Sequence, residues 1–313
     1  MKKPLVILTG PTAVGKTRAS IGLAKSIGGE IISADSMQVY QHMDIGSAKI
    51  TREEMEHVPH YLVDEISPEE EFHVVRFQNM AKKAMKQIYE NGHIPIIVGG
   101  TGFYIQALLY DIDFTENEKD EQYRQGLEQM AKEKGAGYLH EQLQKVDEKS
   151  ALEIHANNVK RVIRALEYYH QTGQPISEHN ERERQKQSPY NFAYFVLNDQ
   201  REILYQRIDA RVDAMMQMGL EAEVKELRDM GMNRNHVSMQ GLGYKEILEY
   251  LDGECTLDEA VYKIKRDTRH FAKRQLTWFK RERDVIWLDK HLYSEEELLE
   301  LMKKELRERQ ILC

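Results

Sequence analysis

Cysteine is nearly absent from this sequence of 313 residues, which contains only Cys255 and Cys313. Two cysteines cannot form a disulfide framework, and they provide no CxxC pair of the kind that holds a structural metal. Long hydrophobic runs are missing as well, since no window approaches the roughly 18–20 apolar residues of a membrane-spanning helix. The apolar part of the N-terminal stretch MKKPLVILTGPT is also too short for a signal peptide. We therefore interpret it as a first buried strand, and we expect a cytoplasmic protein with no membrane association.

An excess of positive charge is also lacking. The formal net charge is −8 at pH 7, because 52 Asp and Glu outnumber 44 Lys and Arg. This sum by itself argues against a nucleic-acid partner. A polyanion, however, responds to the charge of the face that it contacts, so the distribution of the basic residues has to decide the question.

What the sequence does contain is an alternation of short apolar runs with helical patterns, which is typical of a parallel sheet covered by helices on both faces. Between 115 and 189 no strand-like run occurs, and the apolar residues have helical spacing. We therefore expect an α/β core formed by 1–114 and 190–313, with an all-helical insertion domain at 115–189. The predicted strands are 4–9, 30–35, 94–100, 192–197 and 284–289, and the clearest predicted helices are 16–27 and 72–91.

The sequence GPTAVGKT has the spacing of a phosphate-binding P-loop. Its glycines allow the backbone to curl so that successive N–H groups point toward phosphate oxygens. Lys16 adds a positive charge, the Thr17 hydroxyl can ligate Mg²⁺, and the helix that follows directs its positive dipole end at the same point. Because the loop follows a strand and precedes a helix, we expect a P-loop NTPase-like core. The predicted phosphate-binding residues are Gly10, Pro11, Thr12, Ala13, Val14, Gly15, Lys16 and Thr17.

The carboxylate of a nucleotide-hydrolysing P-loop protein is missing from its usual place. In those proteins an Asp at the end of a second apolar strand holds Mg²⁺, whereas the strongest such run here, IPIIVGG, ends in glycines. The nearest acid at a strand end is Asp35. It could be a Mg²⁺ ligand, a general base acting on an acceptor, or a cap for the turn that follows, and its spacing does not choose among the three.

The stretch at 263–283 carries nine Lys and Arg and only two acids, Asp267 and Glu282. A solvated helix face is one interpretation, but such faces usually mix both signs of charge. We therefore favour a helix that binds a polyanion. A second basic stretch, with Lys160, Arg161 and Arg164, either forms an opposite wall or pairs with acids of its own domain. On the first helix one stripe contains Lys263, Arg266, His270, Lys273, Thr277 and Lys280, and the far side contains Ile264, Thr268, Phe271, Gln275 and Phe279, flanked by Val261 and Ala272.

Eight segments, in order along the chain, resemble those of the tRNA dimethylallyltransferases. They are GPTAVGKT, ISADSMQVYQHMDIGSAK, HYLVD, VGGTGFY, NNVKRVIRALE, GLEAEV, GLGYKE and AKRQLTWFKR, and the resemblance extends from residue 4 to about residue 289. DSMQVY and KRQLTWFKR are not general features of P-loop proteins. The resemblance implies an enzyme that transfers a dimethylallyl group from dimethylallyl diphosphate to N6 of the adenosine 3′ to the anticodon (position 37) of tRNA, with release of diphosphate.

On this resemblance, the P-loop holds a departing diphosphate, and Lys16 with Mg²⁺ on Thr17 faces the charge that develops on it. Thr12 resembles a residue that contacts the bridging oxygen. Arg207 is our candidate for a second cation on the diphosphate, with an ordinary helix-surface arginine as the alternative. Asp35 matches the general base for the adenine amine, which is a weak nucleophile, and Thr101 matches a position near the acceptor.

The resemblance also implies contacts to the anticodon stem-loop of tRNA, from which the target base is flipped into a pocket. Aromatic and basic residues in alternation suit splayed single-stranded bases, although Phe279 is expected in the core. Including the three cations of the stretch 160–164, the predicted tRNA-binding residues are Asp35, Ser36, Met37, Gln38, Thr101, Arg124, Lys160, Arg161, Arg164, Gly241, Gly243, Tyr244, Lys245, Lys273, Arg274, Gln275, Trp278 and Lys280.

Two other functions share part of these features. A P-loop small-molecule transferase, such as a nucleotide kinase or a prenyltransferase acting on free AMP, needs the loop but not the basic helix. A nucleotide-switched RNA-binding protein needs the basic helix but not Asp35. The hypothesis that uses all of the features is a tRNA prenyltransferase, which we expect to act as a monomer with Mg²⁺ as its cofactor.

Overall fold

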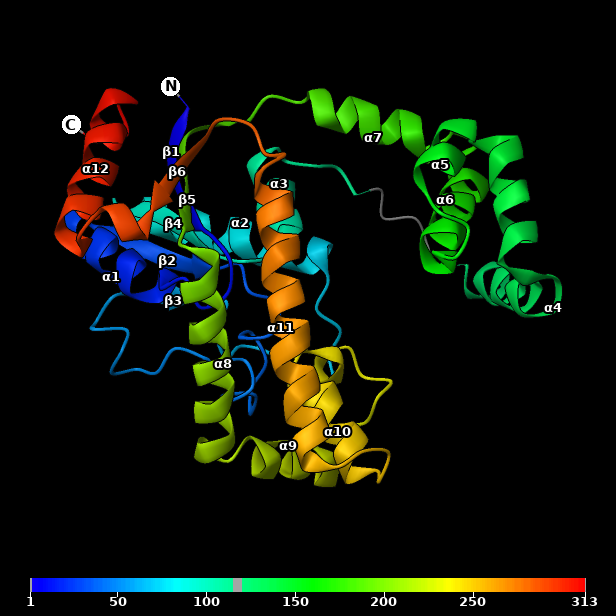
Figure 1. Cartoon of the computed structure of the whole chain (residues 1–313). Helices are drawn as coiled ribbons and strands as arrows, with labels where there is room; N and C mark the ends of the chain where they lie inside the picture. The colour runs from blue at the N-terminus through cyan, green and yellow to red at the C-terminus, as the bar shows by residue number, and fades with distance from the viewer. Residues whose placement is uncertain (1, 115–119, 313) are drawn as a thin grey trace. The chain divides into compact units, whose positions relative to one another are not determined.

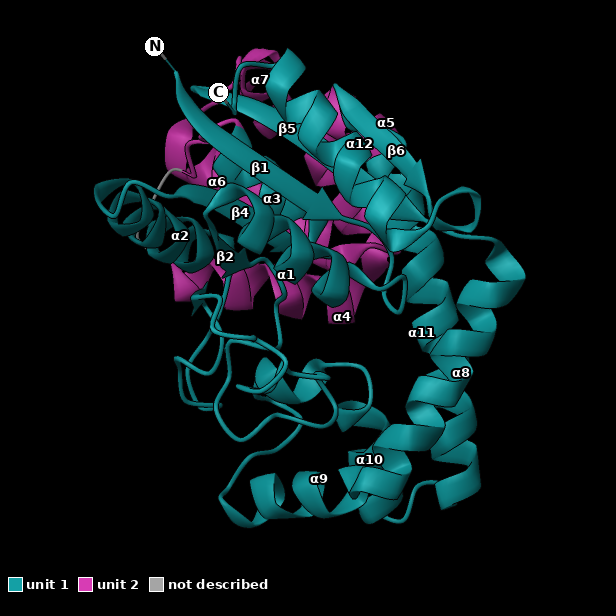
Figure 2. Cartoon of the chain, turned by 90° about the vertical axis from the view of Figure 1, so that its left-hand side faces the viewer, with its two compact units in different colours: residues 1–109, 189–313 teal, residues 110–188 magenta. Residues whose placement is uncertain are grey.

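The computed structural model describes residues 2–114 and 120–312. It divides the chain into two compact units, which are Met1–Leu109 with Pro189–Cys313 (unit 1) and Tyr110–Ser188 (unit 2) (Figure 2). The boundaries predicted from the sequence lie between residues 114 and 115 and between residues 189 and 190. Residues 115–119 of the expected insertion and Cys313 lie outside the described residues. No helix in the described ranges combines the length and the apolar character that crossing a membrane requires.

Unit 1 is built on a six-stranded sheet with the order β3-β2-β4-β1-β5-β6, in which all paired strands are parallel. The α/β fold expected from the sequence is thereby confirmed. The strands are β1 (Lys3–Thr9), β2 (Gly29–Ser33), β3 (His60–Tyr61), β4 (Ile94–Gly99), β5 (Tyr190–Asn198) and β6 (Val285–Asp289). Only β3 was not predicted, because two half-buried residues leave no apolar run to detect.

Helices cover both faces of this sheet. In the strand order, β2 lies on one side of β1, and the chain then returns in the opposite direction from β2 to β4. Because crossovers between parallel strands are right-handed, the helices of these two connections, α1 and α2, lie on opposite faces of the sheet. The helices of unit 1 are α1 (Lys16–Ile27), α2 (Val74–Glu90), α3 (Gly102–Leu109), α8 (Arg201–Met218), α9 (Leu220–Asp229), α10 (Tyr244–Leu251), α11 (Leu257–Phe279) and α12 (Glu295–Glu308), with 3-10 turns η1 (Ser238–Gln240) and η2 (Lys290–Leu292) (Figure 1).

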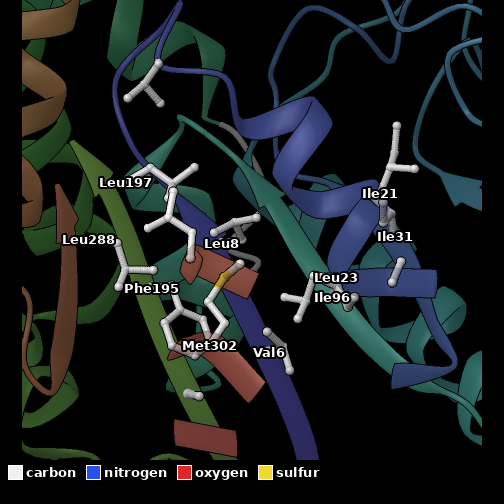
Figure 3. Packing of buried hydrophobic residues seen from close by; sticks show 14 of the residues in the cluster. Val6, Leu8, Ile21, Leu23, Ile31, Ile96, Phe195, Leu197, Leu288 and Met302 are labelled. Carbon is white, nitrogen blue, oxygen red and sulfur yellow. The ribbon is translucent and has the colours of Figure 1, made fainter. Parts of the chain in front are cut away.

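The core on the α1 face shows why these segments fold together. Alternate residues of β1, Val6 and Leu8, lie in one apolar cluster with Leu23 of α1 and Met302 of α12 (Figure 3). Each of these four side chains is at most 1% exposed, and burying a side chain of this size contributes about 1.5–3 kcal/mol. The cluster fixes α1, and with it the P-loop, against the centre of the sheet.

The parallel arrangement brings the loops that carry the motifs to the carboxyl edge of the sheet. The P-loop follows β1 at the centre, the segment with Asp35 follows β2, and the glycine-rich segment 99–102 follows β4. Two long helices, α8 and α11, pack side by side below this edge in Figure 1. Ligands of open α/β sheets bind outside the carboxyl ends of the strands, so this edge is where a functional site is expected.

Unit 2 is helical in the residues that the structure describes. Its helices are α4 (Glu121–Val146), α5 (Glu148–Glu153), α6 (Val159–Thr172) and α7 (Ile176–Gln185). Leu139 and Leu143 of α4 pack with Val162 and Leu166 of α6 in a separate apolar core. Gly135, with φ +86°, kinks α4 at its middle. The helical character predicted from the spacing of apolar residues in this segment is confirmed.

Candidate active site

The P-loop turns sharply between β1 and α1. Gly10 has φ +147°, and a Cβ at this position would collide with the carbonyl oxygen of Leu197 at the end of β5. Gly15 has φ +93° and immediately precedes α1. Between them Ala13 also adopts a left-handed conformation, with φ +62°. Residues of this kind turn successive backbone N–H groups toward one point, which forms an anion-binding concavity at the start of a helix.

Lys16 is folded back over this loop. Its Nζ donates hydrogen bonds to the carbonyl oxygens of Gly10 at 3.0 Å and Pro11 at 2.9 Å. Burial lowers the pKa of Lys16 to about 8; the Asp35 carboxylate acts in the opposite direction and Arg211 in the same direction. A bound anion would favour the charged form. Lys16 is therefore positioned to give its charge to a phosphate in the loop.

Asp35 follows β2, and its two carboxylate oxygens have different surroundings. Oδ1 accepts a hydrogen bond from the backbone N–H of Met37 at 2.8 Å and a longer one, at 3.4 Å, from that of Gln38. Oδ2 has no hydrogen bond within the described ranges of the chain. The carboxylate also interacts electrostatically with Lys16 and Arg211. It thus caps its own turn with one oxygen and keeps the other without a hydrogen bond to a described residue, within electrostatic range of Lys16 and Arg211.

The second cation of the site is Arg211, which sequence reasoning missed. Arg211 is half-buried on α8, where burial lowers its pKa while the carboxylates of Asp35 and Glu54 act in the opposite direction. Arg207, the residue predicted for this role, lies one turn earlier, and its Nη1 donates at 2.7 Å to Oδ2 of the buried Asp199. The geometry therefore moves the candidate role from Arg207 to Arg211, because Arg207 is engaged at the end of β5.

The glycines of VGGTGFY allow three segments to approach one another closely. A Cβ on Gly99 would overlap the backbone of Ala34, one on Gly100 the amide of Gln275, and one on Gly102 the indole of Trp278. Thr101, the predicted acceptor-side residue, is half-buried between them. The end of β4 is thereby packed against the end of β2 and against α11.

Gln275 connects α11 to the P-loop. Its Nε2 donates to the carbonyl oxygen of Gly100 at 3.0 Å, and its Oε1 accepts from the backbone N–H of Thr12 at 2.9 Å. The side chain is 6% exposed. The prediction that Gln275 contacts tRNA is corrected by this burial, since both ends of its amide are bonded inside the protein. Gln275 instead holds the first turn of the P-loop.

The segment after Asp35 is held by hydrogen bonds to two residues that are distant in the sequence, Glu223 and Tyr244, which we call the Glu223 clamp. The carboxylate of Glu223 accepts hydrogen bonds from the backbone N–H groups of residues 44, 45 and 46, at 2.9, 2.7 and 3.0 Å, and from the Tyr244 hydroxyl at 2.8 Å. Tyr244 is fully buried, and Gly241 and Gly243 are buried as well. These three were predicted to contact tRNA. Their burial corrects that prediction, and Lys245 alone of this group is partly exposed.

The residues that immediately follow Asp35 remain accessible. Ser36, Met37 and Gln38 are each half-buried. The Gln38 amide donates to the carbonyl oxygen of Ala48 at 3.0 Å, and the Met37 thioether packs against Gly241. The loop is thus held by its own side chains and by the Glu223 clamp, in a position beside the P-loop.

The basic surface of α11 divides into two halves. In the first half, Lys263, Lys265, Arg266 and Arg269 form ion pairs with Glu249, Asp213, Asp267 and Asp209. In the second half and directly after the helix, Lys273, Arg274, Lys280, Arg281 and Arg283 form no ion pair with any described residue, and all five are exposed. Burial raises the pKa of Glu282 to about 7, so this acid is only partly ionised near neutral pH and does not balance their charge. Excess positive charge is therefore concentrated at the end of α11 nearest the sheet.

Aromatic side chains accompany these cations. The ring centroids of Trp278 and Phe103 are 6.2 Å apart in an edge-to-face arrangement, and Phe103 is 42% exposed. Trp278 also lines a surface hollow with His270, Lys273, Arg274, Thr277 and Arg281. Phe279 is fully buried, as predicted. An exposed Phe103 beside a half-buried Trp278, among unpaired cations, can stack on bases while the cations bind phosphates.

In unit 2 the residues predicted to contact RNA differ in whether they form ion pairs within the protein. Arg124 lies within 3.4 Å of Glu167 and 3.5 Å of Glu128. Lys160, Arg161 and Arg164 on α6 are exposed and have no ion pair among the residues that the structure describes. The alternative in which the three cations of α6 pair with acids of their own domain therefore finds no support in this part of the chain.

A metal site made only of protein side chains is not found among residues 2–114 and 120–312, where no group of three or more His, Cys, Asp and Glu is suitably placed. The Thr17 hydroxyl is exposed at the first turn of α1, and its Oγ1 makes no hydrogen bond to a described residue. One protein hydroxyl with bound phosphate oxygens and water is a common arrangement for Mg²⁺. The residues present therefore fit a Mg²⁺ ion that arrives with a phosphate ligand.

Comparisons with known proteins agree on one family. The sequence model of the IPP transferase family matches residues 38–282, a range that begins after the P-loop. The tRNA dimethylallyltransferase of Lachnoclostridium phytofermentans is 64% identical over 311 residues, 99% of both chains. The tRNA isopentenylpyrophosphate transferase of Bacillus halodurans superposes with a TM-score of 0.74 at 44% identity, over 99% of this chain and 98% of that one. A eukaryotic dimethylallyltransferase acting on tRNA gives a TM-score of 0.80 at 31% identity, over 92% of this chain and 74% of that one.

Proposed function

This chain belongs to the IPP transferase family and prenylates tRNA with dimethylallyl diphosphate as the donor, and we propose that the acceptor atom is N6 of the adenosine 3′ to the anticodon, position 37. The observation that carries the proposal is that Lys16, folded over the P-loop, interacts electrostatically with both Asp35 and Arg211, which also interact with each other. Two cations and one carboxylate with a free oxygen suit a transfer in which an anion leaves and a proton is removed.

The leaving group is stabilised by the loop and its cations. As the bond between the allylic carbon and the bridging oxygen breaks, negative charge develops on the diphosphate. Lys16, which is folded over the loop, and Arg211, its electrostatic neighbour, are proposed to face that charge together with the free backbone N–H groups of the loop, and so to stabilise the transition state more than the ground state. Thr12 is held for contact with the bridging oxygen by its bond to Gln275.

The acceptor is activated by Asp35. The N6 amine attacks the allylic carbon, and the proton that it loses passes to Oδ2 of Asp35, the oxygen that the turn leaves free. The lone pair of an exocyclic adenine amine is delocalised into the ring, so proton removal during bond formation contributes about 10²–10⁴ in rate. The half-buried Thr101 at the end of β4 lies on the same edge of the sheet and is proposed to orient the acceptor.

Mg²⁺ is proposed as the metal that accompanies the diphosphate, with Thr17 as its protein ligand. When bound, the ion supplies positive charge that neutralises the leaving group. Asp35 interacts electrostatically with Lys16 of the loop and with Arg211, and its Oδ1 is occupied by the turn. These contacts favour the base role for Asp35 over a metal-ligand role.

The surface for tRNA is proposed to comprise the second half of α11 with residues 280–283 that follow it, the aromatic pair of Phe103 and Trp278, and the segment after Asp35. The unpaired cations contact phosphates, and the aromatic pair stacks on bases of an unpaired loop. Because the base must leave its stack to reach Asp35, a single-stranded loop is a better acceptor than a duplex. The exposed cations of α6 are proposed to bind the same RNA.

The function is tested by incubating the protein with unmodified tRNA, dimethylallyl diphosphate and Mg²⁺, and then measuring the masses of the nucleosides by mass spectrometry. A mass gain of one C5H8 on a single adenosine, located by nuclease mapping at the position 3′ to the anticodon, is the expected result. A tRNA with guanosine at that position is the matched control and should gain nothing. Modification at another nucleotide would contradict the proposed position, and gain on free AMP would contradict the choice of acceptor.

Charge removal at Lys273 and Arg274 is expected to weaken tRNA binding and to flatten its salt dependence. Each phosphate that is no longer neutralised should lower the slope of log affinity against log salt by about 0.7–0.9. Filter binding between low and physiological salt measures this slope. The control variant, Lys304→Gln with Arg307→Gln, removes two exposed charges from α12 and should leave the slope unchanged. Equal slopes for both double variants would show that α11 is only a solvated face.

A further inference from the structure

Lys290 is a third cation beside the P-loop, in addition to Lys16 and Arg211. It begins η2, directly after β6. Its ammonium group lies against Gly15, where an added Cβ would be only 2.7 Å from Nζ. Gly15 is exposed and immediately precedes α1. Lys290 therefore lies at the rim of the loop, where a bound anion can reach it.

The position is electrostatically unfavourable for an ammonium group unless an anion is present. The N-terminus of α1 carries the positive end of the helix dipole. The acids on the adjoining segments have other partners, since Asp289 accepts a hydrogen bond from Asn198 at 2.7 Å and Glu295 pairs with Arg18 at 2.7 Å. No ion pair among the described residues includes Lys290. A cation held in this way suits a phosphate ligand.

The strand order defines which end of the donor Lys290 would contact. Asp35 follows β2 and Lys290 follows β6, and these strands lie on opposite sides of β1 in the order β3-β2-β4-β1-β5-β6. The allylic carbon has to face Asp35, because the acceptor is activated there. The far end of the donor, its terminal phosphate, is then directed away from Asp35 and toward the side of β5 and β6.

We propose that Lys290 binds the terminal phosphate of the donor and thereby selects a diphosphate over a monophosphate ester. This inference rests on the proposed function, in which the P-loop holds the leaving group. A charge-assisted hydrogen bond to the terminal phosphate is available to a diphosphate, whereas a monophosphate seated at the Asp35 end cannot form it. Lys290 touches neither the acceptor nor the allylic carbon, so its effect is on donor affinity.

Calorimetric titration of the full chain with inorganic pyrophosphate and with inorganic phosphate, in the presence of Mg²⁺, tests the inference. Lys290→Met is expected to weaken pyrophosphate binding by about 10-fold and phosphate binding by less than about twofold. Lys290→Arg keeps the charge and should bind pyrophosphate nearly as the natural protein does. Lys304→Met on α12 is the control for removal of an exposed lysine and should have no effect. In turnover with tRNA, Lys290→Met should raise KM for the donor about 10-fold with kcat nearly unchanged.

The outcomes separate this inference from the function on which it rests. Pyrophosphate affinity unchanged by Lys290→Met but abolished by Lys16→Met would overturn the role of Lys290 and leave the P-loop assignment intact. A loss of kcat without a change in KM would also overturn it, because that pattern indicates an interaction made only in the transition state and not one that sets donor affinity. Failure of the natural protein to bind pyrophosphate would overturn both.

Discussion

Replacing Asp35 by asparagine is expected to slow dimethylallyl transfer by at least about 100-fold while tRNA affinity stays nearly the same. The amide oxygen of asparagine can still accept the N–H of Met37, so the turn keeps its cap. The amide cannot take a proton from the N6 amine, so the contribution of general base catalysis, about 10²–10⁴, disappears. Single-turnover rates with saturating donor and tRNA measure this step without interference from product release.

Asp35→Ala is the companion variant, because it removes both the cap and the base. Equal losses in the two variants would assign the effect to proton transfer. If Asp35→Asn instead keeps the natural rate and Asp35→Ala does not, the carboxylate only caps its turn, which is one of the roles that the sequence left open.

The second large effect is expected at Arg211. Arg211→Met should lower kcat/KM for the donor by about 10²–10³, the usual result of removing one group directed at developing negative charge. Arg207→Met is the matched control, since it removes the same side chain one helical turn away, and it should change kcat/KM by only a few-fold. Steady-state kinetics with varied donor at saturating tRNA distinguish the two.

Arg207→Met should have a different consequence. It leaves the buried carboxylate of Asp199 without its partner at 2.7 Å, which is expected to reduce the free energy of unfolding by about 1–3 kcal/mol. Urea denaturation of both variants measures this. The reverse pattern, with catalysis abolished in Arg207→Met and kept in Arg211→Met, would restore the assignment made from the sequence.

The sheet and the P-loop could be predicted from the sequence because each has a strong local signal. Strands buried on both faces appear as continuous apolar runs, and the loop has fixed spacing between its glycines and Lys16. The two-residue strand β3 has no such signal, because its pairing with β2 is set by tertiary contacts.

The corrections at the site arise where one helical turn or the burial of one side chain matters. Arg207 and Arg211 are separated by four residues and share a face of α8, so sequence spacing cannot tell which of them lies beside the P-loop. Gln275 falls within a basic motif, yet it lies on the buried side of α11, where it bonds the loops that follow β1 and β4, as its helical spacing with Phe279 already indicated. Tyr244 was assigned to tRNA by resemblance, whereas its hydroxyl closes the Glu223 clamp.

The claim that the P-loop holds a departing diphosphate is tested most directly by following both products in one single-turnover reaction without ATP. The mechanism predicts that inorganic diphosphate and dimethylallyl-adenosine appear in equal amounts with the same rate constant, and that added ATP is not hydrolysed. A requirement for ATP, or release of orthophosphate in step with tRNA modification, would contradict it.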